Sequence, residues 1–334
     1  MALLNPTLSD PGNKYEGLLQ PGISAKVTLG ANDYDLWHVA TATGSKTRLA
    51  YASAEVTVSA IESICTLTDN SNRTLEFINL ELKRFGAQET MCIDHLYPSD
   101  FAEHSSFFAH TVDAELANQW ALEFAEQFSL EMQAARWVGG LAGYDAATYG
   151  NGLIQQLEGK GVYNASTNVE GYQRLNATNV PVDASNIVDE IKGVLALLPF
   201  KVKQHKDFKV VLSPKAANAL QTAALVQTGV NNMAAPQADL NNGLMMNNFL
   251  GLNINVYVAE GLGYSADSED TILAGVMGNS KNAFAKWGVN QPSDEGFVQL
   301  RVVQDDDFLQ MRIGAAQAVG IVPDVSQVAI NNIV

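Results

Sequence analysis

The sequence feature that most constrains the fold is a long amphipathic segment at about 113–137. Large apolar side chains recur there at steps of four, and alanines widen the same side. Gly139 and Gly140 supply a helix stop, and Arg136 suits the negative end of the helix dipole. At 1.5 Å per residue, about 24 residues give a rod of roughly 36 Å. We therefore expect a spine helix. Its large apolar residues are Leu116, Trp120, Phe124, Phe128 and Met132, and its alanines are Ala117, Ala121, Ala125 and Ala135.

Residues 1–50 are predicted to form an extended N-terminal arm. Prolines and glycines are spaced along it so that no long helix fits between them. Leu3-Leu4 and Leu18-Leu19 lack enough apolar neighbours for a core of their own. We expect them to dock on the body of the same chain or on a neighbouring subunit. The interrupting residues are Pro6, Pro11, Gly12, Gly17, Pro21, Gly22, Gly30 and Gly44.

A long β-hairpin is expected next. Residues 54–60 alternate strictly, residues 74–82 form a second β-like run, and residues 68–73 between them are typical of a turn. The apolar phase of the second run changes between Phe77 and Ile78, which indicates a bulge or a change of buried face. Because an isolated ribbon is marginal in water, it needs a surface to lie on.

The middle of the chain predicts an α/β unit after loops and short strands at 138–182. Asp183 or Ser185 caps a helix that Pro199 ends. Residues 208–212 then read as a short buried strand, followed by Ser213 as N-cap and Pro214 at the first helical position. The apolar residues of the two helices are Ile187, Val188, Ile191, Val194, Leu195 and Leu198 in the first, and Ala216, Ala217 and Leu220 in the second.

The last third is rich in predicted strands. Residues 227–248 are polar and Asn-rich, which favours a mobile loop. Strands are expected at 252–258, 272–276 and 297–303. Asp305–Asp307 turns the chain into a strand at 308–313, and a Gly/Ala-rich strand ends near Pro323.

Composition excludes some classes of protein. The 334 residues are 47% hydrophobic and 17% charged, which is ordinary for one large or two smaller globular domains. A formal charge of −16 argues against a dedicated nucleic-acid reader, although it does not exclude proximity to DNA. Cys65 and Cys92 make neither a disulfide framework nor a zinc pattern. We expect no signal peptide, because no basic region followed by an apolar core is present at the N-terminus. We expect no membrane helix, because no apolar run approaches the length that one needs.

Catalytic motifs are missing as well. The chain lacks GxxxxGK[ST], GxSxG and HExxH, and Gly261-Leu-Gly263 lacks the third glycine of a dinucleotide fingerprint. We therefore assign no catalytic, cofactor-binding or metal-binding residue, and expect no cofactor, no metal and no enzymatic activity. The histidines are scattered, at His38, His95, His104, His110 and His205.

Three groups of residues invite a chemical interpretation, and a simpler one is favoured for each. Cys92, Asp94 and His95, with His104, could pair a nucleophile with a base or hold a metal. A catalytic thiolate needs a base fixed by the fold, however, and proximity in sequence does not supply that. Asp305–Asp307 could hold calcium but is more simply a solvated turn. The aromatic residues of the spine could line a ligand groove, yet their helical spacing favours core packing.

Several passages in order resemble the major capsid proteins of tailed phages of the Hong Kong 97 type. In that family the arm, hairpin, spine and α/β unit are called the N-arm, E-loop, P-domain and A-domain. The similar passages are Trp137-Val-Gly-Gly with Gly152-Leu-Ile, Val210-Val-Leu-Ser-Pro-Lys-Ala-Ala-Asn-Ala-Leu220, Phe249-Leu-Gly-Leu-Asn-Ile-Asn-Val256 and Gly278-Asn-Ser-Lys-Asn-Ala-Phe284.

The resemblance implies an α+β fold in five parts. Residues 1–50 would be the N-arm, 51–86 the E-loop hairpin, 87–145 the P-domain with its spine, 146–270 the A-domain, and 271–334 returning strands mainly of the P-domain. No charged helical segment precedes the arm, so scaffolding would be a separate protein. Some relatives join subunits through a Lys–Asn bond, and nothing here identifies such a pair.

The function that the resemblance implies is that of a major capsid protein. Copies would assemble as hexamers and pentamers into an icosahedral shell around double-stranded DNA. Portal, scaffolding and decoration proteins are candidate partners, DNA would be packaged without sequence-specific binding, and no membrane is involved. The subunit would be made in the host cytoplasm and end in the virion. The alternatives are an encapsulin-like nanocompartment shell, a tail-tube subunit, and an α/β enzyme with residues 183–326 as catalytic domain.

Overall fold

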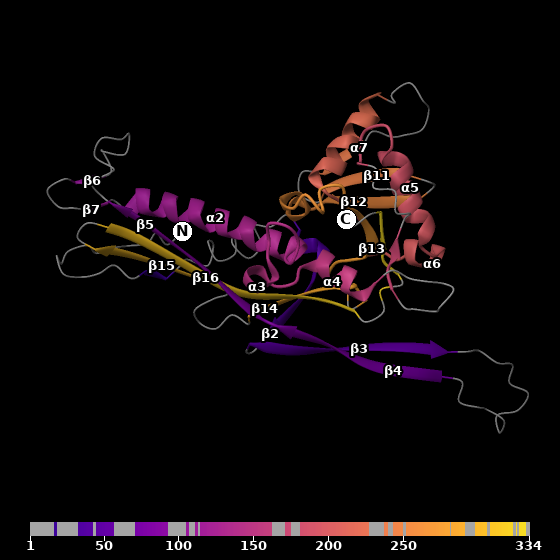
Figure 1. Ribbon diagram of the computed structural model, residues 1–334, viewed down its shortest axis with the longest axis horizontal. Coiled ribbons are helices and arrows are strands. Elements are labelled where there is room, and N and C mark those ends of the chain that lie inside the picture. The colour runs from indigo at the N-terminus through magenta and orange to yellow at the C-terminus, as the bar shows by residue number, and fades with distance from the viewer. Residues whose placement is uncertain are drawn as a thin grey trace, which may run out of the picture.

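A long helix, two sheets and a projecting two-stranded ribbon make up the computed structural model of the chain (Figure 1). The helix lies along one sheet, and the second sheet stands beside it with helices of its own. The structure describes residues 17–18, 33–42, 45–56, 71–92, 105–106, 111–112, 114–161, 171–174, 181–226, 237–239, 243–249, 252–280, 282–290, 298–305, 308–322, 325 and 327–331.

Helix α2, Ala114–Val138, confirms the predicted spine to within one residue at each end. Phe128 and Met132 are buried as their spacing predicts, and Trp120 and Phe124 are half-buried. From Met132 onward every residue of the helix is buried, because its last turns lie between the two sheets. Gly140 ends the helix with a φ of 91°, a backbone conformation that favours glycine.

The first sheet has six strands in the order β1-β15-β16-β14-β2, with β5 paired to β16. Its strand β16 joins the two predicted C-terminal strands into one, and β15 confirms the strand expected at 297–303. Strands β2, β5 and β14 were not predicted, and β2 runs parallel to β14. The bounds are β1 Gly17–Leu18, β2 His38–Ala42, β5 Lys83–Cys92, β14 Ala285–Asn290, β15 Val298–Asp305 and β16 Phe308–Ile321.

The second sheet has seven strands in the order β10-β11-β12-β9-β13-β17-β8. Strands β9, β12 and β13 confirm the predictions, and β9 is buried throughout. The mobile loop predicted at 227–248 is wrong where β10 and β11 extend the sheet, because ladder bonds use backbone groups that Asn-rich side chains do not remove. The bounds are β8 Gln173–Arg174, β9 Phe208–Leu212, β10 Gln237–Asp239, β11 Gly243–Phe249, β12 Leu252–Val258, β13 Ile272–Val276 and β17 Ala329–Ile330.

Two helices stand where loops and short strands were expected at 138–182. In α4, Leu153, Ile154 and Leu157 are fully buried, and α4 contacts α2 and β16. The glycines around these short helices hid their apolar period from the sequence pattern, and only β8 agrees with the prediction. The helices are η1 Tyr34–Leu36, α3 Ala146–Tyr149, α4 Leu153–Lys160, α5 Ile187–Leu197, α6 Phe200–Lys203, α7 Pro214–Val226 and η5 Glu260–Tyr264.

Of the two predicted helix caps in the second sheet, only the one at Ser213 is confirmed. Ser213 Oγ accepts a hydrogen bond from Ala216 N–H at 3.1 Å, which satisfies a backbone donor that the first turn of α7 leaves free. The cap predicted at Asp183 or Ser185 is wrong, because α5 begins after Asn186, whose side chain caps no N–H group. Asp183 Oδ1 instead accepts from the backbone N–H groups of Ser185 and Asn186 in the turn before the helix.

A backbone contact between glycines joins the end of α2 to the start of α4. Gly152 N–H donates to Gly139 O at 2.7 Å. A Cβ at Gly152 would lie 2.6 Å from Gly139 N, and a Cβ at Gly139 would lie 2.6 Å from Gly150 O. No side chain fits between these backbones, which gives Gly139 and Gly152 a physical role.

A buried ion pair ties the N-terminal part of the chain to the spine. Asp33 is fully buried, and its Oδ1 accepts a hydrogen bond from Arg136 Nη2 at 2.9 Å. Its Oδ2 accepts from Trp37 Nε1 at 3.1 Å and from Trp137 Nε1 at 2.6 Å. Arg136 therefore does more than face the helix dipole, because it is paired inside the core.

The same network continues into the first sheet. Arg136 Nη1 donates to Gln317 Oε1 at 3.3 Å, and the guanidinium lies 4.3 Å from the centre of the Trp287 ring. Gln317 in turn donates to Met132 O at 2.9 Å. Residues that flank η1 and residues from α2, β14 and β16 thus meet around one charge pair.

Part of the predicted N-terminal arm belongs to this body. Leu36 and Trp37 lie in the main hydrophobic cluster, and β2 is a strand of the first sheet. For residues 33–42 the arm therefore docks on the body of the same chain, which was one of the two alternatives expected. Leu3-Leu4 lies outside the described residues, and Leu18 pairs with Arg301 of the same chain through β1.

The glycine contact gives a first prediction. We expect Gly152→Ala to lower the free energy of unfolding by about 1–3 kcal/mol, because its methyl group overlaps backbone that cannot move aside cheaply. Gly159→Ala is the matched control, since a Cβ at Gly159 meets nothing within 4 Å. In the helix α4 that control should be neutral or stabilising by about 0.5–1 kcal/mol. Urea unfolding followed by circular dichroism measures both, and equal stabilities would contradict the assignment.

The buried ion pair gives a second prediction. Asp33→Ala leaves Arg136 charged and buried without its carboxylate, so we expect a loss of about 3–5 kcal/mol in unfolding free energy. Glu81→Ala removes an exposed ion pair, Lys46–Glu81, and should cost only about 0–1 kcal/mol. Thermal unfolding of the two variants beside the unaltered protein checks the difference. A loss at Asp33 no greater than at Glu81 would show that the network does not hold the body together.

Candidate assembly surfaces

The ribbon is the most protruding part of the described structure (Figure 1). It consists of β3, Lys46–Val56, and β4, Ser71–Glu81, paired antiparallel. This confirms a hairpin, although β3 begins before the expected residue 54, and residues 57–70 lie outside the described part. The register runs without a shift from Lys46↔Glu81 to Val56↔Ser71, so no bulge exists there.

The foot of the ribbon is packed into the body. Ile78 and Leu80 are buried, and they account for the phase change seen in the sequence because Phe77 points to the opposite face. A Cβ at Gly320 would lie 2.4 Å from Leu80 Cδ2, and one at Gly288 would lie 3.1 Å from Leu80 Cδ1. These two glycines of β16 and β14 leave room for the Leu80 side chain.

A lysine fixes the point where the ribbon enters the sheet. Lys83, the first residue of β5, donates from Nζ to Ala146 O at 3.0 Å and also to Ala147 O. Both acceptors belong to the short helix α3. Since only Leu82 separates β4 from β5, this contact holds the foot at a set angle to the sheet.

The outward face of the ribbon carries an aromatic ring beneath a cation. Phe77 is 42% exposed, and Arg48 Cζ lies 3.7 Å from the centre of its ring. Lys46 and Glu81 form an exposed ion pair on the same face. Both residues are exposed, so Phe77 and Arg48 are available to another molecule.

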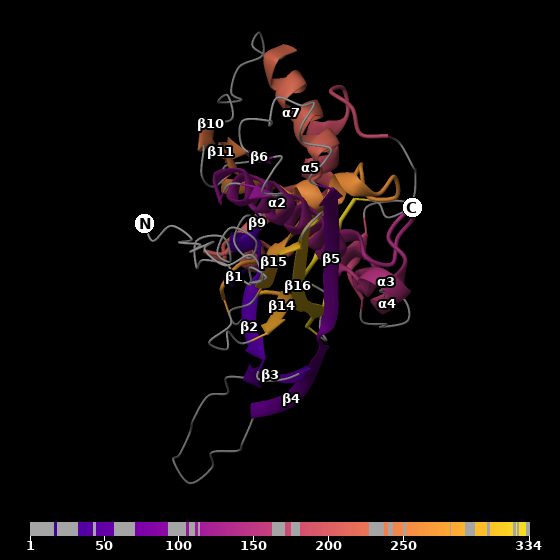
Figure 2. The same ribbon diagram turned by 90° about the vertical axis from the view of Figure 1, so that its left-hand side faces the viewer.

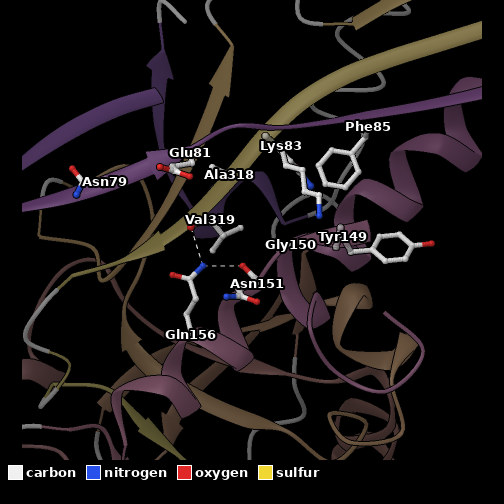
Figure 3. Close-up of a pocket in the computed structure, with 12 residues that line it drawn as sticks. Asn79, Glu81, Lys83, Phe85, Tyr149, Gly150, Asn151, Gln156, Ala318 and Val319 are labelled. Carbon is white, nitrogen blue, oxygen red and sulfur yellow. Dashed lines mark hydrogen bonds between the residues drawn. The ribbon is translucent and has the colours of Figure 1, made fainter. Parts of the chain in front are cut away.

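A cavity of about 310 Å³ lies at the foot of the ribbon (Figure 3). Gln156 spans its floor, where Nε2 donates to Asn151 O and to Val319 O, both at 2.8 Å. Glu81 and Lys83 are its only ionisable residues apart from Tyr149, and Lys83 is held by α3. Among its described lining residues, no serine, cysteine or threonine stands beside a base.

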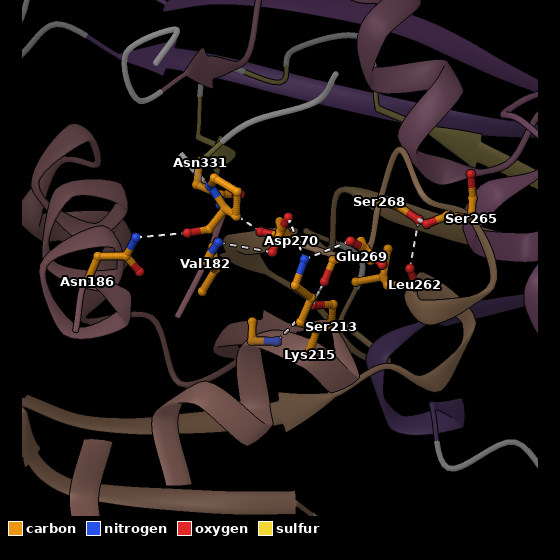
Figure 4. Close-up of polar contacts among 12 residues, drawn as sticks. Val182, Asn186, Ser213, Lys215, Leu262, Ser265, Ser268, Glu269, Asp270 and Asn331 are labelled. Atoms are coloured by element: carbon orange, nitrogen blue, oxygen red, sulfur yellow. Dashed lines mark hydrogen bonds and ion pairs between the residues drawn. The ribbon is translucent and has the colours of Figure 1, made fainter. Parts of the chain in front are cut away.

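A second polar cluster fastens α7 to the turn before β13 (Figure 4). Lys215 Nζ donates to Glu269 Oε1 at 2.6 Å and to Asp270 Oδ2 at 3.0 Å. The hydrogen bond to Glu269 is the main cause that raises the pKa of Lys215. Asp270 Oδ1 accepts from Val182 N–H at 3.0 Å, and Asn331 Nδ2 donates to Asp270 O at 2.8 Å. Every group has a structural partner, which assigns the cluster to stability.

The structure brings few of the suggested chemical residues together. Cys92 is a free, half-buried thiol at the end of β5, but Asp94, His95 and His104 lie outside the described residues, as do Cys65 and His110. That cluster therefore stays untested. Asp305 ends β15, and Asp306 and Asp307 are not described.

The remaining candidates have ordinary partners. His38 Nδ1 lies 3.3 Å from Asn279 O, and His205 accepts a hydrogen bond from Asp207 N–H. Gly261 lies in η5, where a Cβ would approach Trp137 Cδ1 to 2.4 Å, so the glycine serves close packing. No group of three or more His, Cys, Asp or Glu residues in the described segments is placed to hold a metal ion. Among the described helices, none combines the length and the apolar composition needed to span a bilayer.

Two buried lysines have altered pKa values. Desolvation lowers the pKa of Lys286, on β14, to about 8. Desolvation also lowers the pKa of Lys209, although Asp35 and Asp207 act against it, and Lys209 Nζ lies 4.6 Å from the centre of the Tyr257 ring. Burial, with Glu131 nearby, raises the pKa of Tyr144 to about 12.

Comparison with known proteins identifies the fold. No protein-family model matches the chain, and a search of curated proteins gave no match. Among solved structures, the capsid of an empty GTA particle computed with C5 symmetry is 15% identical with a TM-score of 0.53, covering 97% of this chain and 94% of that one. The satellite phage P4 procapsid including the size determination (Sid) protein is 10% identical with a TM-score of 0.52, covering 94% and 99%. The chain therefore has a mixed α/β fold similar to that of phage capsid proteins.

The buried Lys286 gives a third prediction. The unfolded chain keeps this lysine charged up to about pH 10.4, whereas the folded protein releases its proton near 8, so the penalty for burying the charge is complete below pH 8 and fades as pH rises toward 10.4. We expect the stability of Lys286→Met relative to the unaltered protein to be greatest at pH 7 and to fall as pH rises to 10.5, where the buried lysine is neutral. Urea unfolding of both proteins across this pH range measures the difference in their free energies of unfolding. A difference in unfolding free energy that stays constant with pH would contradict the lowered pKa of Lys286.

Proposed function

We propose that this chain is the major capsid protein of a tailed bacteriophage of the Hong Kong 97 type. The observation that carries the proposal is the ribbon, which leaves the body with an exposed Phe77 and Arg48 on its outward face. A ribbon of two strands is marginal alone, so its outer part gains a surface when copies associate. The fold shared with capsid structures over nearly the whole chain supports the same conclusion.

The parts of the subunit take roles in this proposal. The ribbon is the E-loop, expected at residues 51–86 and extended by β3 back to Lys46, and it overlaps a neighbouring subunit. The P-domain, residues 87–145 and most of 271–334, contains α2 and the main strands of the first sheet. The A-domain, 146–270, contains α5 to α7 and most of the second sheet, to which β13 and β17 from 271–334 are added. Residues 1–50 are the N-arm, of which the part beyond residue 32 is anchored by Asp33. In this proposal the two sheets and their helices form a rigid unit, and the ribbon and the N-arm connect neighbouring units.

The proposed assembly is an icosahedral shell of hexamers and pentamers enclosing double-stranded DNA. The fivefold symmetry used for the similar GTA capsids supports pentamers. The net charge of −16 fits a wall that contains DNA without binding it tightly. Portal, scaffolding and decoration proteins are the proposed partners, with assembly in the host cytoplasm and a final place in the virion. No catalytic activity is part of the proposal.

Light scattering and negative-stain microscopy of the purified protein test the proposal. We expect pentamers, hexamers or closed shells at high protein concentration. A strictly monomeric, compact protein under the same conditions would contradict it. Neighbouring genes for a portal and a terminase distinguish a phage capsid from a nanocompartment shell, because only the phage packages DNA through a portal.

The exposed ring on the ribbon gives a fourth prediction. We expect Phe77→Ser to raise the concentration needed for assembly at least tenfold, since a buried aromatic anchor commonly contributes more than 1 kcal/mol to an interface. Thermal stability of the monomer should change less than assembly does, because Phe77 is an exposed residue of the ribbon and not part of the core. Phe77→Tyr keeps the ring and should assemble as the unaltered protein does. Sedimentation of concentration series measures all three, and unchanged assembly of Phe77→Ser would exclude this ring from the interface.

A further inference from the structure

Strand β5 forms one border of the first sheet (Figure 2). It pairs with β16 along its whole length, from Lys83↔Gln317 to Cys92↔Phe308, without any shift in register. On its other side, no strand among the residues that the structure describes pairs with it. The backbone N–H and C=O groups that point outward along this border thus have no ladder partner within the described part of the chain.

This border lacks two features that commonly prevent one sheet from joining another, a proline and a β-bulge, although Arg84 and Glu89 carry charges along it. Its ten residues contain no proline and no bulge, and the strand spans roughly 33 Å. Lys83, which could guard the border with its charge, is drawn to the carbonyl groups of α3 instead. Arg84, Gln88 and Thr90 are exposed beside it. A long, regular edge of this kind is a template for an added strand.

The opposite border of the same sheet shows that the chain can supply such a strand. There β1 adds to β15 through Gly17↔Val302 and Leu18↔Arg301. The sheet therefore ends on one side with β1, an extended segment of the N-terminal part. On the other side it ends with β5, whose outer edge pairs with no described strand. Copies placed head to tail would bring the β1 border of one subunit to the β5 border of the next, which is a contact that closes into rings when the rotation allows it.

We propose that the outer edge of β5 binds an extended segment of a second copy of this chain by adding it as a further strand. This inference rests on the self-assembly proposed above and names one surface that carries it. Main-chain hydrogen bonds would supply the attraction, and the exposed side chains of Arg84 and Gln88 would contact the side chains of the added strand. The ribbon and this edge are separate surfaces, joined only through the foot.

Proline scanning tests the proposal because successive residues of an antiparallel edge strand alternate in direction. Of Gln88 and Glu89, one directs its N–H toward β16 and the other directs it outward. Gln88→Pro and Glu89→Pro therefore form a pair in which one variant breaks the sheet of the monomer, and the other removes only an outward donor. The variant that keeps the Tm of the unaltered protein is the informative one. Alanine at the same position is its control, because it retains the N–H.

We expect the informative proline variant to need at least tenfold more protein to assemble, while its alanine control assembles normally. Hydrogen exchange on the unaltered protein adds an independent readout, since outward amides of residues 84–92 should become protected in assemblies. Normal assembly of the proline variant, or amides that stay unprotected in assemblies, would overturn this inference and leave the proposed function standing. An unaltered protein that never assembles would overturn both.

Discussion

The carboxylate of Asp33 is the interaction on which the arrangement of the body depends. It accepts hydrogen bonds from Arg136, Trp37 and Trp137 inside a core that excludes water. A buried ion pair adds little stability over apolar packing, but it is costly whenever one donor is displaced. The network therefore disfavours alternative alignments of the N-terminal part, the spine and the first sheet. A precise body is what a subunit needs if many copies must meet at fixed angles.

The parts of the molecule that hold the backbone in place are separate from the surfaces that are free to bind another copy. The glycine contact at Gly139 and Gly152, the Leu80 socket and the Lys83 contact with α3 all fix backbone near the foot of the ribbon. Beyond the foot, Phe77 and the outer edge of β5 face away from the described body. Association then costs little conformational entropy, because the elements that present these surfaces are already ordered.

Local periodicity predicted the elements whose folding is decided by their own residues. The spine, the strand β9 and the Ser213 cap of α7 follow from spacing and capping chemistry alone. Strands β2 and β14 were missed because their partners, not their own patterns, make them strands. Asp33 and Arg136 lie 103 residues apart, so no sequence window contains both. Of the candidate surfaces, the ribbon was predicted from the alternation of apolar and polar residues. The free edge of β5 could not be predicted, because it can be recognised only once the strand order is known.

The near-continuity of β4 and β5 has a mechanical consequence. A single residue, Leu82, separates them, so a pull on the ribbon travels along the backbone into β5. There it meets the ladder with β16, whose bonds run across the direction of the force. Hydrogen bonds loaded in this way share the strain and must break together, instead of opening one after another like a zip. If ribbons connect the subunits of a closed shell, this geometry would raise the force needed to separate neighbouring subunits when the shell is under internal pressure.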